Sequence, residues 1–213
     1  MPVRVKICGV TTVEDAQKAA ELGADAVGLN FHPGSPRYVG LEMAAQIASA
    51  LPVSVEVVGV FVERGWQEIR ETIAMLRELH SVQRHGEPLT EAPPASWRIV
   101  PAFGINDAGD LNRITRHIED CKVRGWMPAA VLVDAHVAGL HGGTGRTAPW
   151  NILAEFRVSV PVMLAGGLTP ENVAEAIRTV RPHAVDVASG VESRPGRKDA
   201  EKLKQFIDSA KSA

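Results

Sequence analysis

An acidic residue and a glycine-rich loop lie at a spacing that suits the handling of an anionic ligand. The apolar run 131–133 ends in Asp134, and a loop rich in glycine begins eight residues later at Gly142 and Gly143. Glycine has no Cβ atom, so the backbone N–H groups of such a loop can converge on an anion. The pattern therefore predicts a reactive carboxylate beside an oxygen-rich ligand, with a glycine-rich surface hairpin as the alternative.

The thiols and imidazoles of the chain show no spacing typical of a metal site. Cys8 and Cys121 lie far apart without a paired CxxC spacing, and His32, His136 and His141 fall in loop-like segments. This usage is typical of free thiols in a reducing cytosol. We therefore expect no metal site, no disulfide and a cytoplasmic location.

The composition is that of an ordinary globular protein. The 213 residues are 45% hydrophobic and 23% charged, with a formal net charge of -2. This charge, with Lys and Arg scattered along the chain, argues against nucleic acid as a partner. There is no signal-peptide pattern and no run of about 18 apolar residues, so we expect no membrane partner. A single domain over residues 1–213 fits this length.

Short β-type runs alternate with helical patterns along the whole chain. The expected strands are residues 3–7, 26–31, 55–62, 81–84, 98–102, 130–133, 160–165 and 184–188. One expected helix follows Thr12, and the others cover residues 41–50, 66–79, 106–122, 150–156, 170–180 and 198–210. Prolines allow at most a short helix over residues 87–96. Eight such units favour a parallel, closed TIM (β/α)8 barrel over an open doubly wound sheet.

The carboxyl ends of the strands are where barrels of this kind carry their active sites. Because side chains alternate along a strand, Val5 and Ile7 should face the helices while Lys6 and Cys8 face inward. Arg84 should point outward and either extend to solvent or pair with an acid. The inward residues expected at the rim are Cys8, Gln83, His85, Asp134 and Asp186.

Six motifs at these strand ends resemble those of one enzyme family. They are Lys6-Ile7-Cys8-Gly9, Ser35-Pro36-Arg37-Tyr38-Val39, Val82-Gln83-Arg84-His85-Gly86, residues 142–147, Ala165-Gly166-Gly167-Leu168, and Ser189-Gly190-Val191-Glu192-Ser193 with Pro195-Gly196 and Lys198-Asp199. Together they are similar to the phosphoribosylanthranilate isomerases of tryptophan biosynthesis. The resemblance implies a TIM barrel that catalyses an Amadori rearrangement without a cofactor.

The resemblance also implies one acid and one base. The substrate would be N-(5-phosphoribosyl)anthranilate, isomerised to 1-(2-carboxyphenylamino)-1-deoxyribulose 5-phosphate. A protonated Asp134 would supply a proton to the ring oxygen as the furanose opens, and Cys8 as thiolate would remove the C2′ proton. We expect the positive charge of Lys6 to lower the pKa of Cys8 moderately.

A small phosphorylated substrate would be held by groups around the same rim. Arg37 offers a planar fork for the anthranilate carboxylate. Asp186 could instead pair with Lys6, and His85 could be a purely structural hydrogen-bonding group. We expect a monomer or weak homodimer. The further expected substrate contacts are Gly142, Gly143, Gly166, Gly167, Ser189, Gly190, His85 and Asp186.

Two other functions fit parts of this pattern. A histidine-pathway phosphosugar isomerase, or a bifunctional relative, would carry aspartate in place of Cys8 and repeat its phosphate loops in both barrel halves. A non-catalytic phosphosugar-binding barrel would need neither an acid nor a base. The presence of Cys8, Arg37 and Asp134 together favours the isomerase.

Overall fold

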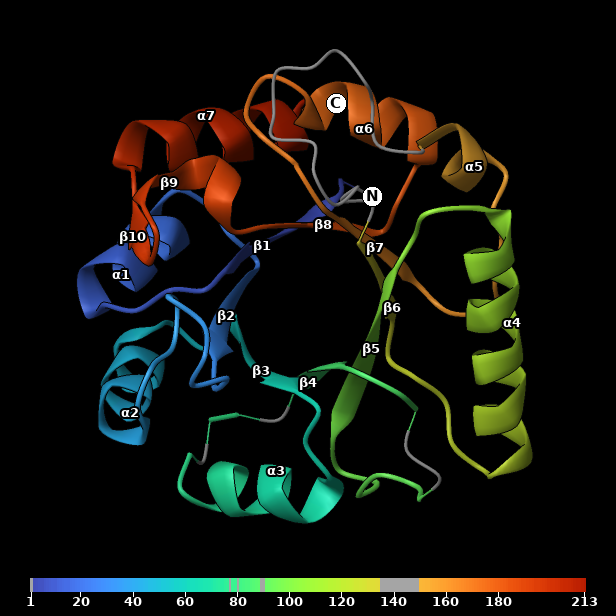
Figure 1. The fold of residues 1–213 in the computed structure, drawn as a ribbon. Helices are drawn as coiled ribbons and strands as arrows, with labels where there is room; N and C mark the ends of the chain where they lie inside the picture. The colour runs from blue at the N-terminus through green and yellow to red at the C-terminus, as the bar shows by residue number, and fades with distance from the viewer. Residues whose placement is uncertain (1, 77, 80, 89–90, 135–149) are drawn as a thin grey trace.

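The computed structural model describes residues 2–76, 78–79, 81–88, 91–134 and 150–213. Eight parallel strands close into a barrel in chain order, so that the last strand pairs with the first (Figure 1). The expected TIM barrel is confirmed, with strand boundaries close to those predicted. The strands are β1 (Arg4–Cys8), β2 (Ala26–Asn30), β3 (Glu56–Val62), β4 (Ser81–His85), β5 (Arg98–Gly104), β6 (Val131–Asp134), β7 (Val162–Ala165) and β8 (Ala184–Val187).

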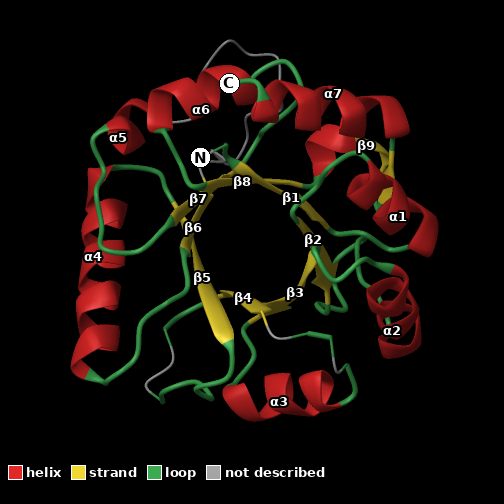
Figure 2. Cartoon of the chain, turned by 180° about the vertical axis from the view of Figure 1, so that it is seen from behind, coloured by secondary structure: helices red, strands yellow, loops and turns green. Residues whose placement is uncertain are grey.

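The helices form an outer layer around the barrel (Figure 2). Their first turns carry the expected signals: the Thr12 side chain accepts a hydrogen bond from the Asp15 N–H. Between β4 and β5, the described part of residues 86–97 contains no helix, as the prolines there predicted. The helices are α1 (Val13–Glu21), α2 (Leu41–Ala50), α3 (Trp66–Ala74), α4 (Ala108–Val123), α5 (Trp150–Ala154), α6 (Val173–Val180) and α7 (Ala200–Lys211).

The segment after β8 differs from the expectation. A 3-10 turn, η1 (Ser189–Val191), leads into an antiparallel hairpin of β9 (Glu192–Arg194) and β10 (Arg197–Lys198). The predicted helix start at residue 198 is therefore wrong, because Lys198 belongs to the hairpin. Helix α7 begins only after Asp199, whose carboxylate accepts the N–H groups of Glu201 and Lys202.

Apolar side chains fill two concentric layers. Outward residues of the strands, such as Val5, Ile7 and Leu29, are fully buried beneath the helices. A second cluster, formed by Val100, Leu132 and Ala165, lies on the inner face of the barrel. The alternation that separates these layers also decides which polar residues reach the interior, so the same pattern builds the core and positions the site.

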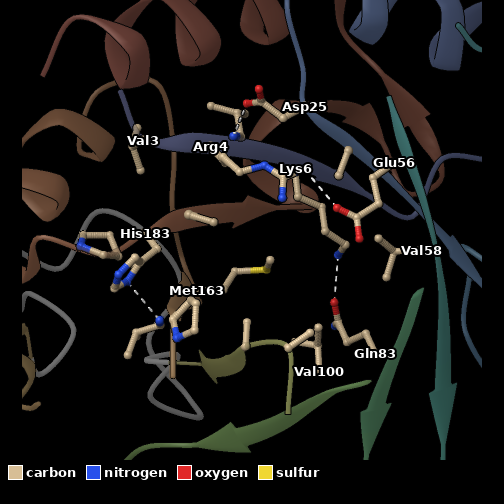
Figure 3. A pocket seen from close by; sticks show the side chains of 18 of the residues that line it. Val3, Arg4, Lys6, Asp25, Glu56, Val58, Gln83, Val100, Met163 and His183 are labelled. Atoms are coloured by element: carbon tan, nitrogen blue, oxygen red, sulfur yellow. Dashed lines mark hydrogen bonds and ion pairs between the residues drawn. The ribbon is translucent and has the colours of Figure 1, made fainter. Parts of the chain in front are cut away.

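A cavity of about 460 Å³ opens at the amino ends of the strands (Figure 3). Its wall includes Val58, Val100 and Met163, and at its edge Arg4 donates a 2.9 Å hydrogen bond to Glu56. Lys6, midway along β1, is the deepest of its charged side chains. The cavity lies at the end opposite to the predicted rim residues Cys8 and Asp134, where barrels of this kind carry stabilising rather than reactive groups.

Candidate active site

The predicted reactive side chains lie at the carboxyl ends of their strands. Cys8, His85 and Asp134 are the last residues of β1, β4 and β6, and Asp186 lies on β8. Asp134 is in register with Ala165 of β7 and Gly104 of β5, two residues without bulky side chains. The expected contacts Gly142 and Gly143 lie outside the described residues.

Inside the barrel, one ammonium group joins three strands. The Lys6 Nζ donates to Asp186 Oδ1 at 2.7 Å and to Gln83 Oε1 at 2.8 Å, and the Lys6 side chain is 1% exposed. Burial alone would lower the pKa of Lys6, but the attraction of Asp186 and Cys8 raises it, so the group stays charged. Asp186 thus makes the ion pair that the sequence allowed as its alternative role.

The Cys8 thiol lies beside this ammonium, in space that a glycine on the next strand leaves open. A Cβ atom on Gly28 would lie 2.9 Å from the Cys8 Sγ and 3.1 Å from the Lys6 Nζ. Burial and the charge of Asp186 raise the pKa of Cys8, and they outweigh Lys6 and Lys198, which act to lower it. The expected lowering of this pKa is therefore wrong for the ligand-free protein, because the thiol is buried and the charge of Asp186 opposes that of Lys6.

His85 connects the interior network to the rim. One of its ring nitrogens, Nε2, lies 2.9 Å from Gln83 Nε2, and the Oε1 of the same Gln83 side chain accepts a hydrogen bond from Lys6. Burial lowers the pKa of His85, although the carboxylates of Asp134 and Asp186 act to raise it. His85 is therefore neutral at physiological pH, and its position close to both acids supports a hydrogen-bonding role.

Arg37 reaches the rim from the loop after β2. The Ser35 hydroxyl oxygen accepts the Arg37 N–H at 3.1 Å and an Asn30 side-chain N–H at 3.2 Å, which shapes this loop. The stem of Arg37 packs against Gly9, whose φ of 68° suits glycine and where a Cβ would lie 2.4 Å from Arg37 Cδ. Arg37 is thus held close to the end of β1.

The loops after β7 and β8 lie against each other. Gly166 and Gly167 adopt φ values of 92° and 64°, which favour glycine. The Asn172 side chain donates to the Gly167 carbonyl at 2.9 Å and accepts the Thr169 N–H at 2.8 Å, closing the first loop. A Cβ on Gly190 would lie 1.9 Å from the Leu168 carbonyl oxygen, so glycine there permits the two loops to approach. This junction brings together four of the residues expected to hold phosphate.

The sequence analysis quoted two further site residues only as part of a motif and predicted no role for them. Glu192 and Lys198 are buried beside Arg37 and the end of β1, and they form a 2.9 Å ion pair. The Pro195-Gly196 pair between them is a turn signal that could have indicated the hairpin. A helix beginning at Lys198 would have placed its side chain elsewhere.

Arg84 points outward, as alternation predicted, but it pairs with no acid among the described residues. Its guanidinium donates to the carbonyl oxygens of Arg64 at 2.8 Å and Glu87 at 2.6 Å. Burial lowers the pKa of Arg84. Arg84 therefore fixes the segment around β4 and stays apart from the rim.

The part of the chain that the structure describes contains no group of three or more His, Cys, Asp or Glu side chains able to hold a metal ion. None of the described helices is both long enough and apolar enough to cross a membrane.

Comparisons with known proteins agree on one family. Residues 5–209 match the family model for N-(5'phosphoribosyl)anthranilate (PRA) isomerase. The chain is 47% identical over 210 residues to the N-(5'-phosphoribosyl)anthranilate isomerase of Geobacter sulfurreducens, covering 98% of each chain. The crystal structure of phosphoribosyl anthranilate isomerase from Thermotoga maritima superposes with a TM-score of 0.84 at 39% identity, covering 99% of this chain and 100% of that one.

A second solved structure contains a ligand. It is a phosphoribosyl anthranilate isomerase in complex with reduced 1-(o-carboxyphenylamino)-1-deoxyribulose 5-phosphate, with a TM-score of 0.79 and 37% identity, covering 99% of this chain and 100% of that one. These similarities favour the isomerase over the histidine-pathway alternative.

Proposed function

The chain belongs to the N-(5'-phosphoribosyl)anthranilate isomerase family, and on that premise we propose how its own residues carry out the reaction. It is an isomerase of tryptophan biosynthesis. The observation that carries the mechanism is that a thiol and a carboxyl group, Cys8 and Asp134, end two strands at the same rim of the barrel.

Asp134 acts as the general acid and Cys8 as the general base. Asp134 protonates the furanose ring oxygen, and the ring opens to a Schiff base between C1′ and the anthranilate nitrogen. The Cys8 thiolate then removes the C2′ proton, and the electron pair of that bond moves toward nitrogen to give an enolamine. Tautomerisation of the enolamine yields the 1-amino-1-deoxyketose. These are proton transfers within one carbon skeleton, so the chemistry requires no cofactor.

The fixed charges of the barrel interior act on the proposed base in opposite directions. The Lys6 ammonium lies beside Cys8 and favours the thiolate, whereas Asp186, which accepts a hydrogen bond from Lys6, disfavours it. In this proposal Asp186 and His85 act mainly by orienting the interior network. Direct contacts of these two residues with the substrate remain predictions.

The substrate is a small phosphorylated molecule held at two ends. Arg37 binds the anthranilate carboxylate, and backbone groups around Gly166, Gly167, Ser189 and Gly190 bind the phosphate. Support comes from the close approach of the loops after β7 and β8 and from the analogue, a carboxylate and a phosphate on one molecule, bound in a related structure. Gly142 and Gly143 stay predicted contacts from the loop after β6.

The setting of the protein is also part of the proposal. One barrel domain over residues 1–213 contains all of the groups assigned here. We propose that it works in the cytoplasm, in keeping with its free cysteines, and without a nucleic-acid partner, in keeping with its net charge of -2. That it is a monomer or weak homodimer stays a prediction.

An assay on freshly generated phosphoribosylanthranilate tests this function. The fluorescence of the substrate should decay much faster with the purified protein than by spontaneous hydrolysis, and the carboxyphenylamino ketose phosphate should accumulate. A histidine-pathway phosphosugar substrate, offered in parallel, should be turned over far more slowly. Decay at the spontaneous rate, or equal turnover of both substrates, would contradict the proposal.

A further inference from the structure

A buried ammonium group continues the contact between β1 and β8 beyond their last paired residues. The two strands pair as far as Ile7 and Val187. The Lys198 Nζ then donates to the Cys8 carbonyl at 2.6 Å and to the Ala188 carbonyl at 3.1 Å. Its third N–H donates to Glu192 Oε1 at 2.9 Å, and the side chain is 0% exposed. All three N–H groups of the ammonium are therefore used for holding other groups in place.

Glu192 receives this ammonium on one side and the guanidinium of Arg37 on the other. Arg37 Nε donates to Oε1 at 2.9 Å and Arg37 Nη2 donates to Oε2 at 2.7 Å, a bidentate pair. The Glu192 side chain is 3% exposed. Burial would raise the pKa of Glu192, but the hydrogen bonds from Arg37 and Lys198 lower it, so the carboxylate stays charged.

The pairing leaves one edge of Arg37 available. A guanidinium has five N–H donors and two edges that can bind a carboxylate with two parallel hydrogen bonds. Glu192 occupies the edge formed by Nε and Nη2. Among the described residues, no hydrogen bond is made to the edge formed by Nη1 and Nη2. Its plane and direction are fixed because the other edge is tied to a buried anion. The guanidinium is partly accessible, with a side-chain exposure of 22%.

We propose that Glu192 is a positioning residue that orients Arg37 for the aromatic carboxylate of the substrate. The Lys198 ammonium is bonded to both Glu192 and the Cys8 carbonyl. It therefore fixes the position of Arg37, through Glu192, relative to the proposed base. This inference rests on the proposed role of Arg37. It predicts that loss of Glu192 weakens recognition of the carboxylate selectively, with little change in the chemical step.

The test compares two reduced product analogues that differ only in the ring carboxylate. In Glu192→Gln, one oxygen acceptor becomes an NH2 group that faces the N–H donors of Arg37 or Lys198. The variant should bind the analogue with the carboxylate at least about tenfold more weakly than the parent does, because Arg37 is no longer oriented for a charge-assisted bidentate pair with that carboxylate. It should bind the analogue without the carboxylate within about twofold of the parent. KM should rise by a similar factor, with kcat changing less than about threefold. Equal weakening for both analogues would show a purely structural role and overturn the inference.

Three further variants separate the possible explanations of the Glu192→Gln result. Glu56→Gln is the matched control: like Glu192, Glu56 accepts hydrogen bonds from two cationic side chains, Arg4 at 2.9 Å and Arg98 at 3.2 Å, but at the opposite end of the barrel. It should leave both affinities unchanged. Glu192→Asp keeps the negative charge and should show part of the parent's preference for the carboxylate analogue. This variant also carries the test if Glu192→Gln does not fold.

Arg37→Ala separates the inference from the function on which it rests. It should abolish the preference for the carboxylate analogue. If that preference survives in Arg37→Ala, the proposed role of Arg37 is wrong and the role of Glu192 is wrong with it. If Arg37→Ala loses the preference while Glu192→Gln and Glu192→Asp keep it in full, the role of Glu192 alone is overturned.

Discussion

At the scale of single residues, the base of the proposed mechanism is the buried thiol of Cys8, and the neighbouring cation, Lys6, also pairs with Asp186. Lys6 favours the thiolate of Cys8, but its charge is largely committed to Asp186 at 2.7 Å. Burial and Asp186 consequently raise the pKa of Cys8 in the ligand-free protein. A raised pKa leaves fewer molecules ionised at neutral pH but makes each thiolate a stronger base.

Alkylation should report this balance. Because the thiolate is the nucleophile, the rate of Cys8 modification by iodoacetamide should keep rising with pH beyond about 8.5, the ordinary thiol value. Cys8 should still react faster than Cys121 because Cys8 is the more accessible thiol, 8% exposed against 2%. Burial raises the pKa of both thiols, that of Cys121 to about 11. Peptide mass spectrometry at a series of pH values measures both rates, and product analogues should slow only Cys8. Cys121→Ser, which leaves a single cysteine, should keep full turnover. A Cys8 rate that levels off below about pH 8 would contradict the raised pKa.

Asp134→Asn tests the general acid. An amide cannot donate a comparable proton, so kcat should fall by roughly 10²–10⁴-fold, the usual contribution of general acid catalysis. The fluorescence assay measures it, with Asp107→Asn as the control, since asparagine also caps a helix and the Asp107 carboxylate accepts the Gly109 N–H at the start of α4. Turnover close to the parent's in folded Asp134→Asn would reject the assignment.

Sequence reasoning at this scale succeeded for the facing of strand residues and for the possible Lys6–Asp186 pair, but it failed for the pairing between loops. Alternation placed Lys6, Cys8 and Asp186 inside the barrel because a strand has only two faces. It could not show that Arg37 meets Glu192, 155 residues away, since that contact depends on how two loops fold over the rim. The direction of the Cys8 pKa shift was also misjudged, because it depends first on how deeply the thiol is buried and then on the charges around it.

At the scale of elements, the loop between β7 and α6 should be sensitive to loss of glycine. Gly167→Val forces a β-branched residue to φ near 64°, a conformation that costs such a residue about 1–2 kcal/mol, and it crowds the proposed phosphate contacts. Gly125→Val is the matched control, with φ of 80° and no atom within 4 Å of an added Cβ. Both should lower unfolding stability similarly. Calorimetric titration with inorganic phosphate should show weaker binding only for Gly167→Val, and equal phosphate affinities in the two variants would contradict this placement.

The elements themselves followed from local signals wherever those signals agreed. The apolar strands and the capped helices α1 and α4 were predictable because periodicity, N-caps and turns indicate the same boundaries. The β9–β10 hairpin was not, because its two short strands carry charged residues without an apolar period. What stabilises it is tertiary: Lys198 donates its N–H to Asp15 of α1 at 3.0 Å and its ammonium to the barrel.

At the scale of the whole molecule, the barrel interior combines an apolar cluster with one ionic network across β1, β4 and β8. Lys6→Met should lower the free energy of unfolding by about 3–5 kcal/mol, because it leaves the buried carboxylate of Asp186 without its counterion. Adding Asp186→Asn should recover much of that loss. Urea denaturation of the two variants and the double variant measures this, and losses that simply add would contradict a direct pairing.

The central claim is that Cys8 removes the C2′ proton, and turnover by Cys8→Ser tests it most directly. A hydroxyl in this position ionises far less readily than a thiol, so it cannot replace the base. The variant should bind the carboxylate-bearing product analogue within about threefold of the parent, while kcat falls by roughly 10²-fold or more. A folded Cys8→Ser protein that binds the analogue normally and turns over substrate within about tenfold of the parent would contradict the account.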